Sequence, residues 1–378
     1  MVAVANLVDL IVVGAGPAGS TAARRAAELG LSTVLVDRAT FPRPKHCAAG
    51  LTDRALGELR GAEAPVMHRR TAVVRLSCGS SPLLSFTGEG ATVATTTRRE
   101  LDNLLLEQAA SSGADVACGV RVATIEQEDG RVVVAGGRWR MSSRYAVVAD
   151  GARGTLRVGL GLPPLRLCGA GYVRAYPGTP SALEPFADEV RFDLTASVRG
   201  YGWIFPKSDH LNIGVFSQRP LSRELLGSLR SYVELLGVTS WRLEGPFAFP
   251  IPLRRRRESC ALERVLLAGD AAALVDPITG EGISYAVMSG RIAAEAVAEN
   301  MSGSGSEAST LYARRVNDEV VPMATALSAR GNLIYALGRG FLLSAARNVP
   351  VRASIVALWR MGRSARAGRL RLLHDVPV

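Results

Sequence analysis

The sequence predicts an α/β fold that begins with a strand–helix–strand unit, carries an inserted antiparallel sheet and ends in a helical region. Three observations carry this prediction. A short apolar strand runs into a glycine loop and a helix near the start of the chain. Several short strand-like runs follow one another within residues 115–149 and 169–217. Apolar residues recur at helical spacing over residues 98–112 and 283–300.

The opening unit has the most regular pattern. Residues 9–13 form a strand, residues 14–19 a glycine turn, and residues 17–29 an alanine-rich helix. Gly30 suits the position just past the end of that helix, and residues 31–36 form the second strand. The apolar start lacks a preceding basic stretch and leads into the turn, so it predicts a strand rather than a signal peptide.

Strands and helices alternate along the rest of the chain. Residues 73–86 predict a pair of strands in a separate sheet. The further expected strands are 115–127, 131–135, 139–149, several within 169–217, 241–251 and 265–268, and the further helices are 98–112, 221–236 and 283–300. Residues 301–309 form a Gly/Ser linker before a basic, helical remainder.

This order predicts a discontinuous first domain. It comprises residues 1–165 and 259–300, and an antiparallel β domain over residues 166–258 is inserted between its two parts. Residues 301–378 form a helical C-terminal region. Residues 70–90 belong either to the first domain or to the inserted domain, and the sequence leaves this choice open.

Composition excludes several classes of protein. With 48% apolar residues the chain is globular, and no stretch of about 18 apolar residues predicts a transmembrane helix. The five cysteines form no CxxC pair and the four histidines are dispersed, so a reduced cytoplasmic protein without a metal site is expected. The net charge of +11 suits an anionic cofactor or membrane surface, while no motif favours nucleic acid.

The basic residues are unevenly divided. Lys45 and Lys207 are the only lysines among the 45 Lys and Arg residues. They are either kept for chemistry or present by chance.

The first glycine loop predicts dinucleotide binding. Gly14 lets the chain turn, Gly16 lets a pyrophosphate approach the backbone, and Gly19 lets the helix pack on the strand. Asp37 ends the second strand, where its carboxylate can accept a hydrogen bond from a ribose hydroxyl. This is a Rossmann-type unit, and we also place Ala18 and Arg38 at the cofactor.

Two later segments identify the dinucleotide as FAD. Residues 147–157 end a strand with Asp150 and Gly151, and residues 265–283 place Asp270 after another strand. Asp270 can hold a ribityl hydroxyl. The helix start offers N–H groups to the N1/O2 edge of the flavin, which becomes anionic on reduction. The cofactor residues expected in this loop are Asp270, Pro277, Gly280, Gly282 and Ile283.

Together these segments resemble the FAD-dependent group of aromatic hydroxylases, flavin halogenases and geranylgeranyl reductases. Residues 201–207, YGWIFPK, match the [FY]-x-W-x-F-P-K signature of the geranylgeranyl reductases at every fixed position. Residues 45–50, KHCAAG, resemble their K-x-C-G-G-G loop with alanine at two glycine positions, and Arg98 to Asp102 matches R-x-x-x-D. The resemblance covers roughly residues 8–300 and implies that Lys45, Cys47 and Arg98 lie at the FAD.

Residues 201–207 also show an alternation of aromatic side chains that can be interpreted without the resemblance. Tyr201, Trp203 and Phe205 share one face of a strand and form an aromatic wall that suits a polyisoprenoid. The alternative is an ordinary buried aromatic strand. Lys207 either fixes a loop or attracts an anionic group, and we expect all four residues to bind substrate.

The expected catalytic residues are Cys47, Tyr201 and Trp203. By resemblance the Cys47 loop reaches the active face of the flavin, although a plain buried cysteine is the alternative. Ala48 and Ala49 replace glycines that allow close approach to the flavin, and Ala273 is a similar departure if the family has glycine there. Arg98 could instead simply pair with Asp102.

The sequence leaves two possible roles for each of two basic segments. Residues 254–257 are either a solvated charge run or a contact for lipid or NADPH phosphate. Residues 352–373 suit an interfacial helix or a helix packed on the protein.

The resemblance implies a reductase that saturates isolated C=C bonds of a prenyl substrate by hydride transfer from N5 of reduced FAD. The implied partner is an apolar prenyl-containing molecule or lipid, with peripheral membrane contact as an expectation and the oligomeric state open. NAD(P)H or ferredoxin is the expected electron donor. A monooxygenase or halogenase is the first alternative, although the W-x-W-x-I-P motif of halogenases is absent, and a non-catalytic flavin- or lipid-binding protein is the second.

Overall fold

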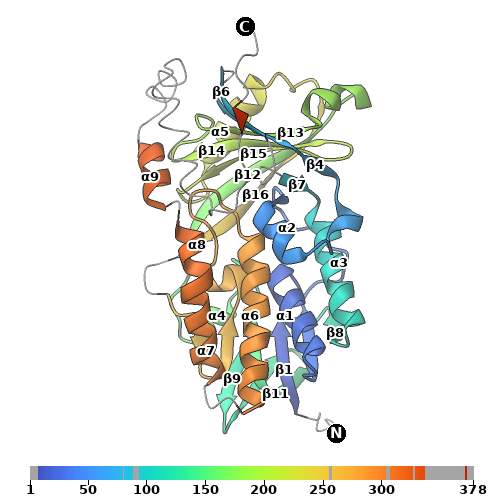
Figure 1. Ribbon diagram of the computed structural model, residues 1–378, viewed down its shortest axis with the longest axis vertical. Coiled ribbons are helices and arrows are strands. Elements are labelled where there is room, and N and C mark those ends of the chain that lie inside the picture. The colour runs from blue at the N-terminus through green and yellow to red at the C-terminus, as the bar shows by residue number, and fades with distance from the viewer. Residues whose placement is uncertain are drawn as a thin grey trace.

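The computed structural model describes residues 7–79, 81–87, 93–254, 258–303, 307–326, 328–336 and 371–372. The molecule is elongated, with one sheet at each end of its long axis (Figure 1). Helices run along one side of the first sheet, and the two sheets approach each other near the middle of the molecule.

The first sheet is built on the opening strand–helix–strand unit. Its strand order is β17-β18-β11-β1-β2-β8, and β10 and β9 extend it from β11. The bounds are β1 Val8–Val13, β2 Thr33–Asp37, β8 Asp115–Cys118, β9 Thr124–Glu128, β10 Arg131–Gly136, β11 Trp139–Val148, β17 Ala261–Leu262 and β18 Val265–Leu267. β1 lies between β2 and β11 and is parallel to both. Its last four residues are buried in the main hydrophobic core.

Three helices cover one side of this sheet. They are α1 (Pro17–Glu28), α3 (Arg98–Ser111) and α6 (Ile283–Met301), and α7 (Ala308–Arg315) packs beside α6. Figure 1 shows α1, α6 and α7 side by side along the long axis. Small alanine side chains let α1 approach α6 closely, and a Cβ at Gly290 would lie 2.1 Å from the carbonyl oxygen of Ala18.

The second sheet has the order β16-β12-β15-β14-β13-β5-β6-β19. Its strands are β5 Val73–Cys78, β6 Ser81–Thr87, β12 Arg166–Tyr176, β13 Glu189–Asp193, β14 Gly200–Pro206, β15 Leu211–Ser217, β16 Arg242–Leu253 and β19 Arg371–Leu372. The expected strand pair over residues 73–86 therefore joins this sheet. The strands of the segment 166–258 pair antiparallel with one another, and β5 joins them parallel to β13. Helix α5 (Arg223–Leu235) covers one face.

The remaining elements are a small sheet and several short helices. A small sheet orders β3-β7-β4. The bounds are β3 Gly50–Thr52, α2 Asp53–Leu59, β4 Arg69–Thr71, β7 Val93–Thr95, α4 Leu156–Gly159, α8 Val321–Thr325 and α9 Ser328–Ala336. The boundaries drawn above for separate domains stay a prediction.

The C-terminal region is helical as far as α9, but its end differs from the expectation. Residues 371–372 form strand β19, which pairs with β6. The rest of the segment 352–373, expected as a helix, lies outside the described residues, as do residues 255–257. Within the described ranges, no helix is both long enough and apolar enough to cross a bilayer.

Candidate cofactor cleft and active site

A cleft of about 420 Å³ lies where the carboxyl ends of the first sheet's strands face β16. This edge of a parallel sheet is where dinucleotides bind in such folds. Fourteen of the expected residues line the cleft, namely Gly14, Gly16, Ala18, Asp37, Arg38, Lys45, Cys47, Arg98, Asp150, Gly151, Asp270, Gly280, Gly282 and Ile283. Residues 248–251 of β16 line it from the second sheet.

The glycine turn is sterically constrained as the motif predicts. Gly14 has φ +102°, and a Cβ there would lie 2.3 Å from the carbonyl oxygen of Ala149. A Cβ at Gly19 would lie 1.7 Å from the carbonyl oxygen of Gly14, so helix α1 can pack this closely only with glycine. Gly16 caps the N-terminus of α1 without a side chain and Pro17 opens its first turn. The N-terminal end of α1 at the cleft suits a pyrophosphate.

Asp37 has a second role beside the one expected. Its carboxylate accepts hydrogen bonds from the backbone N–H of Ala15 at 2.7 Å and of Ala39 at 2.8 Å. It therefore fixes the glycine loop onto β2. Each carboxylate oxygen has a further lone pair, so a ribose hydroxyl can still bind.

Arg98 makes the ion pair with Asp102 that was one of its two expected roles. Its guanidinium makes two hydrogen bonds to Asp102, at 2.6 and 2.9 Å, and also lies 3.8 Å from the place of a Cβ at Gly16. Asp102 is fully buried and also pairs with Arg43 at 3.1 Å. The ion pair thus holds a cation against the glycine loop.

Polar atoms left open in the cleft fit a dinucleotide. Asp150 Oδ1 is buried and receives no hydrogen bond from the part of the chain that the structure describes. Burial raises the pKa of this carboxyl, which a hydroxyl donor would counteract. The Lys45 side chain is 39% exposed, and its Nζ lies 3.9 Å from Asp270 Oδ2. An anionic cofactor therefore suits this end of the cleft.

The loop before α6 presents free N–H groups. Asp276 accepts from the N–H of Ile278 and Thr279, which folds the loop on itself. Nothing in the described ranges accepts a hydrogen bond from the N–H of Gly282 or Ile283, at the start of α6. This is the arrangement expected for the N1/O2 edge of a flavin.

Side chains from three separate parts of the chain donate hydrogen bonds to the carbonyls of this loop. The carbonyl of Pro277 accepts from Gln218 at 3.0 Å, and that of Ile278 from Tyr335 of α9 at 2.6 Å. The carbonyl of Thr279 accepts from the hydroxyl of Tyr201, at the start of β14. Pro277 contributes here through its carbonyl and does not line the cleft.

The loop over residues 45–50 is fixed by Lys207. Its Nζ donates to the carbonyls of Ala48 at 2.9 Å, Ala49 at 3.2 Å and Thr96 at 2.7 Å. Ala49 has φ +50°, which is the left-handed region that favours glycine. The Ala49 N–H donates to Cys47 Sγ at 3.3 Å. Of the two roles expected for Lys207, these contacts support loop fixation.

The aromatic residues of β14 lie together against the same loop. Tyr201, Trp203 and Phe205 belong to one hydrophobic cluster, which Phe192 joins by edge-to-face contacts with Tyr201 and Phe205. A Cβ at Gly50 would lie 2.5 Å from the Phe205 ring, so the loop backbone presses directly onto the wall. None of the three aromatic residues, which were expected to bind substrate, lines the cleft.

Asn212 is a residue that the sequence analysis missed. It is buried in β15, accepts from the Trp203 indole N–H at 2.8 Å and donates to the carbonyl of Cys47 at 3.4 Å. It thus joins the aromatic wall to the Cys47 loop. The signal was a lone amide in the apolar run 211–217.

Comparisons with known proteins agree with this geometry. A family described as FAD binding domain matches residues 7–167. Menaquinone reductase of Mycolicibacterium smegmatis is 37% identical, with 76% of this chain and 75% of that protein covered. Geranylgeranyl diphosphate reductase of Rhodobacter capsulatus is 31% identical, with 76% and 74% covered. The chain belongs to the geranylgeranyl reductase family of FAD-dependent oxidoreductases.

A solved structure shows the same fold. The geranylgeranyl bacteriochlorophyll reductase-like protein of Thermoplasma acidophilum aligns with a TM-score of 0.80 and 23% identity, with 93% of this chain and 96% of that chain covered. The geranylgeranyl reductase loop K-x-C-G-G-G keeps only its last glycine here, Gly50, whose position the Phe205 ring explains. Ala273 has φ +54°, so it too adopts a conformation that glycine favours.

Of the basic run 254–257, the structure describes Arg254. Arg254 donates to the carbonyls of Ala272 and Glu258, and so braces the segment after β18. No group of three or more potential metal ligands occurs in the described part of the chain. All five cysteines are free thiols.

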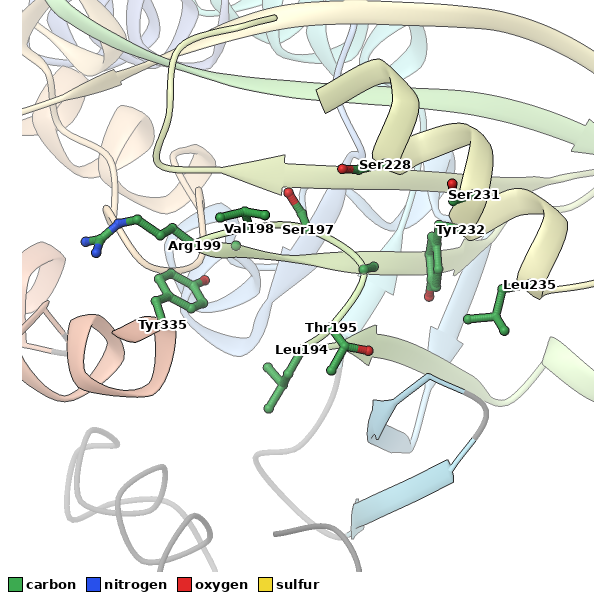
Figure 2. A pocket seen from close by; sticks show the side chains of 12 residues that line it. Leu194, Thr195, Ser197, Val198, Arg199, Ser228, Ser231, Tyr232, Leu235 and Tyr335 are labelled. Atoms are coloured by element: carbon green, nitrogen blue, oxygen red, sulfur yellow. The ribbon is translucent and has the colours of Figure 1, made fainter. Parts of the chain in front are cut away.

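A second cavity of about 330 Å³ lies beside the second sheet (Figure 2). It is lined by residues 194–200, by the α5 side chains Ser228, Ser231, Tyr232 and Leu235, and by Tyr335. Figure 2 shows Tyr335 reaching its rim from α9, close to Arg199. Because Tyr335 also donates to Ile278, α9 connects this rim to the loop before α6.

Proposed function

We propose that the protein saturates isolated C=C bonds in the prenyl chain of an apolar substrate. The observation that carries the proposal is the contact between the aromatic wall of β14 and the Cys47 loop, at Phe205 and Gly50. Family membership supports it, since two of the similar proteins are named for menaquinone and for geranylgeranyl diphosphate, which both contain polyisoprenoid chains.

An isolated alkene gives an enzyme little polarity to recognise. Binding energy must therefore be used to orient the bond and exclude water rather than to polarise it. Reduced FAD, when bound, supplies the hydride. Tyr201, Trp203 and Phe205 form the apolar cluster on which the Cys47 loop packs, and Ala48 of that loop adds a small apolar side chain beside it.

The saturation also needs a proton on the second carbon. The Tyr201 hydroxyl proton is used in a hydrogen bond to Thr279, and the Trp203 N–H in one to Asn212. Burial raises the pKa of Tyr201 far above its usual value, so its hydroxyl is a poor acid. The Cys47 thiol has no acceptor in the described part of the chain, which favours it as the proton donor, with water restoring the proton.

The first substrate to test is a prenylated quinone, because the menaquinone reductase is the more similar of the two relatives. Geranylgeranyl diphosphate is the second. NAD(P)H or ferredoxin is the proposed electron donor, and an apolar prenyl lipid met at a membrane surface is the proposed partner.

The test uses FAD-loaded protein reduced anaerobically with dithionite and mixed with each substrate. Mass spectrometry is expected to show a gain of two hydrogens for each saturated bond. Cys47→Ser is expected to lower the rate by roughly 100-fold, whereas Cys118→Ser, at an exposed thiol, leaves it unchanged. Complete retention of C=C bonds with intact reduced flavin would overturn the proposal. A hydroxylated or halogenated product with oxygen would favour the monooxygenase or halogenase alternative.

A further inference from the structure

Lys207 has an unusual set of partners for a buried cation. Its side chain is 1% exposed, and its three hydrogen bonds all go to backbone carbonyls. No carboxylate lies within 4.0 Å of Nζ in the ranges that the structure covers. Three acceptors require three N–H donors, which only the ammonium form provides. The hydrogen bonds of Lys207 therefore fix the backbone of residues 48, 49 and 96 in place.

This requirement accounts for a lysine at position 207 in a chain whose only other lysine is Lys45. An ammonium group is a compact point donor with three diverging hydrogens, whereas a guanidinium presents its donors in one plane. The carbonyls of Ala48, Ala49 and Thr96 come from two separate segments and converge on one atom. Arginine would not fit this arrangement.

The opposite end of the same strand holds the other loop. Tyr201 donates to the carbonyl of Thr279 from the start of β14, and Lys207 follows its last residue, Pro206. Six residues of extended strand separate the two contacts, about 20 Å at 3.3 Å per residue. β14 is paired on both sides, with β13 and with β15, so it is a rigid element.

We propose that β14 sets the position of the two loops at the cofactor cleft, with Tyr201 and Lys207 as positioning residues at its two ends. Tyr201 holds residues 276–282 and Lys207 holds residues 45–50 with Cys47. The strand thereby fixes the thiol and the start of α6 relative to each other. The proposal rests on the proposed function for its catalytic consequence, but the positioning itself can be measured without turnover.

The experiment uses FAD-loaded protein carrying Cys118→Ser, which leaves Cys47 as the one thiol that is not buried. Lys207→Met removes the donors and keeps an unbranched side chain. Tyr201→Phe removes one hydroxyl. Leu229→Ala destabilises the core beneath α5, away from both loops, and is the matched control.

Hydrogen exchange and thiol labelling are the readouts. Lys207→Met is expected to speed alkylation of Cys47 and amide exchange over residues 45–50 by about tenfold or more, with residues 276–282 unchanged. Tyr201→Phe is expected to speed exchange over residues 276–282 and to leave Cys47 labelling unchanged. Leu229→Ala is expected to change neither loop.

Unchanged labelling and exchange in Lys207→Met, or equal changes in Leu229→Ala, would overturn the proposal. If Lys207→Met does not fold, Lys207→Gln and Tyr201→Phe provide the same comparison. Turnover separates the two proposals. With an active parent, both variants are expected to lower kcat more than they raise KM. With a parent that reduces no prenyl substrate, the proposed function fails while the labelling result still decides the positioning.

Discussion

Ala49 and Ala273 share a left-handed backbone conformation, with φ +50° and +54°. Ala49 lies in the Cys47 loop, and Ala273 directly follows the turn that carries Asp270. An alanine in this region costs roughly 1–2 kcal/mol relative to its preferred conformations. Each residue is held by its neighbours, Ala49 through its carbonyl bonded to Lys207 and Ala273 through its N–H bonded to the carbonyl of Asp270.

Glycine at these positions is expected to stabilise the protein. Ala49→Gly and Ala273→Gly should each raise the free energy of unfolding by about 0.5–1 kcal/mol, because the relief of strain exceeds the added entropy of the unfolded chain. Urea unfolding measures the change. The control is Ala298→Gly within helix α6, which should lower stability by about 1 kcal/mol. A loss of stability at Ala49 or Ala273 would show that the methyl group contributes packing that outweighs the strain.

The cofactor cleft could largely be predicted from sequence because its contacts are local. Gly14, Gly16 and Gly19 act within one turn, and Asp150 and Asp270 each follow a strand directly. Strand, turn and helix fix the relative positions of such residues. Most of the residues predicted for the cofactor therefore line the cleft.

Asn212 is an example of a site residue that could not be predicted from the sequence. Its role depends on β15 pairing with β14 in a register that places it beside Trp203, and on a loop 165 residues away that brings the Cys47 carbonyl within reach. Tyr335 is similar, since its hydroxyl bonds to a carbonyl 57 residues earlier. Such contacts follow from tertiary packing and leave no local pattern.

The Trp203–Asn212 hydrogen bond is expected to couple the two residues energetically. Asn212→Leu leaves a buried indole N–H without an acceptor and should lower the free energy of unfolding by about 1–3 kcal/mol. Trp203→Phe removes the donor, so the double variant should lose less than the sum of the single losses. Urea unfolding of all four proteins measures this. Additive losses would mean that the bond makes no net contribution.

The parallel pairing of β13 with β5 could not be predicted from the sequence either. Residues 73–86 have the pattern of a strand pair, but the pattern does not say which sheet the pair joins or in which direction. Their partner lies more than 100 residues later in the chain.

Lys207 is expected to make stability depend on pH. Burial lowers its pKa from 10.5 to about 7 in the folded protein, and the charges of Cys47 and Glu100 oppose this shift. Between these two values the unfolded chain binds more protons than the folded chain. The free energy of unfolding should therefore rise as the pH increases above about 7, by at most about 1.4 kcal/mol per pH unit. Below about 7 both states are protonated, so the contribution of Lys207 no longer changes.

The measurement compares urea unfolding of the wild type and Lys207→Met between about pH 6.5 and 8.5. The difference between the two proteins should grow in favour of the wild type with increasing pH. At the same time the neutral amine retains only two donors for its three carbonyls, so Cys47 labelling, corrected for the ionisation of a free thiol, should increase in the wild type. A difference that is independent of pH would show that the carbonyls keep Lys207 fully charged.

Arg98 is expected to contribute to both stability and FAD binding. Its guanidinium is bonded to the fully buried Asp102 and faces Gly16 in the glycine loop. Arg98→Met leaves that carboxylate with Arg43 alone and should lower the free energy of unfolding by about 3–5 kcal/mol. Because it also removes a cation beside the pyrophosphate site, FAD should bind at least about tenfold more weakly, as measured by fluorescence titration.

Arg99→Met is the matched control. Arg99 is exposed at the next position of the same helix, and its loss should change stability by no more than about 0.5 kcal/mol. Equal FAD affinity in the two variants would mean that the Arg98–Asp102 pair stabilises α3 without contacting the cofactor.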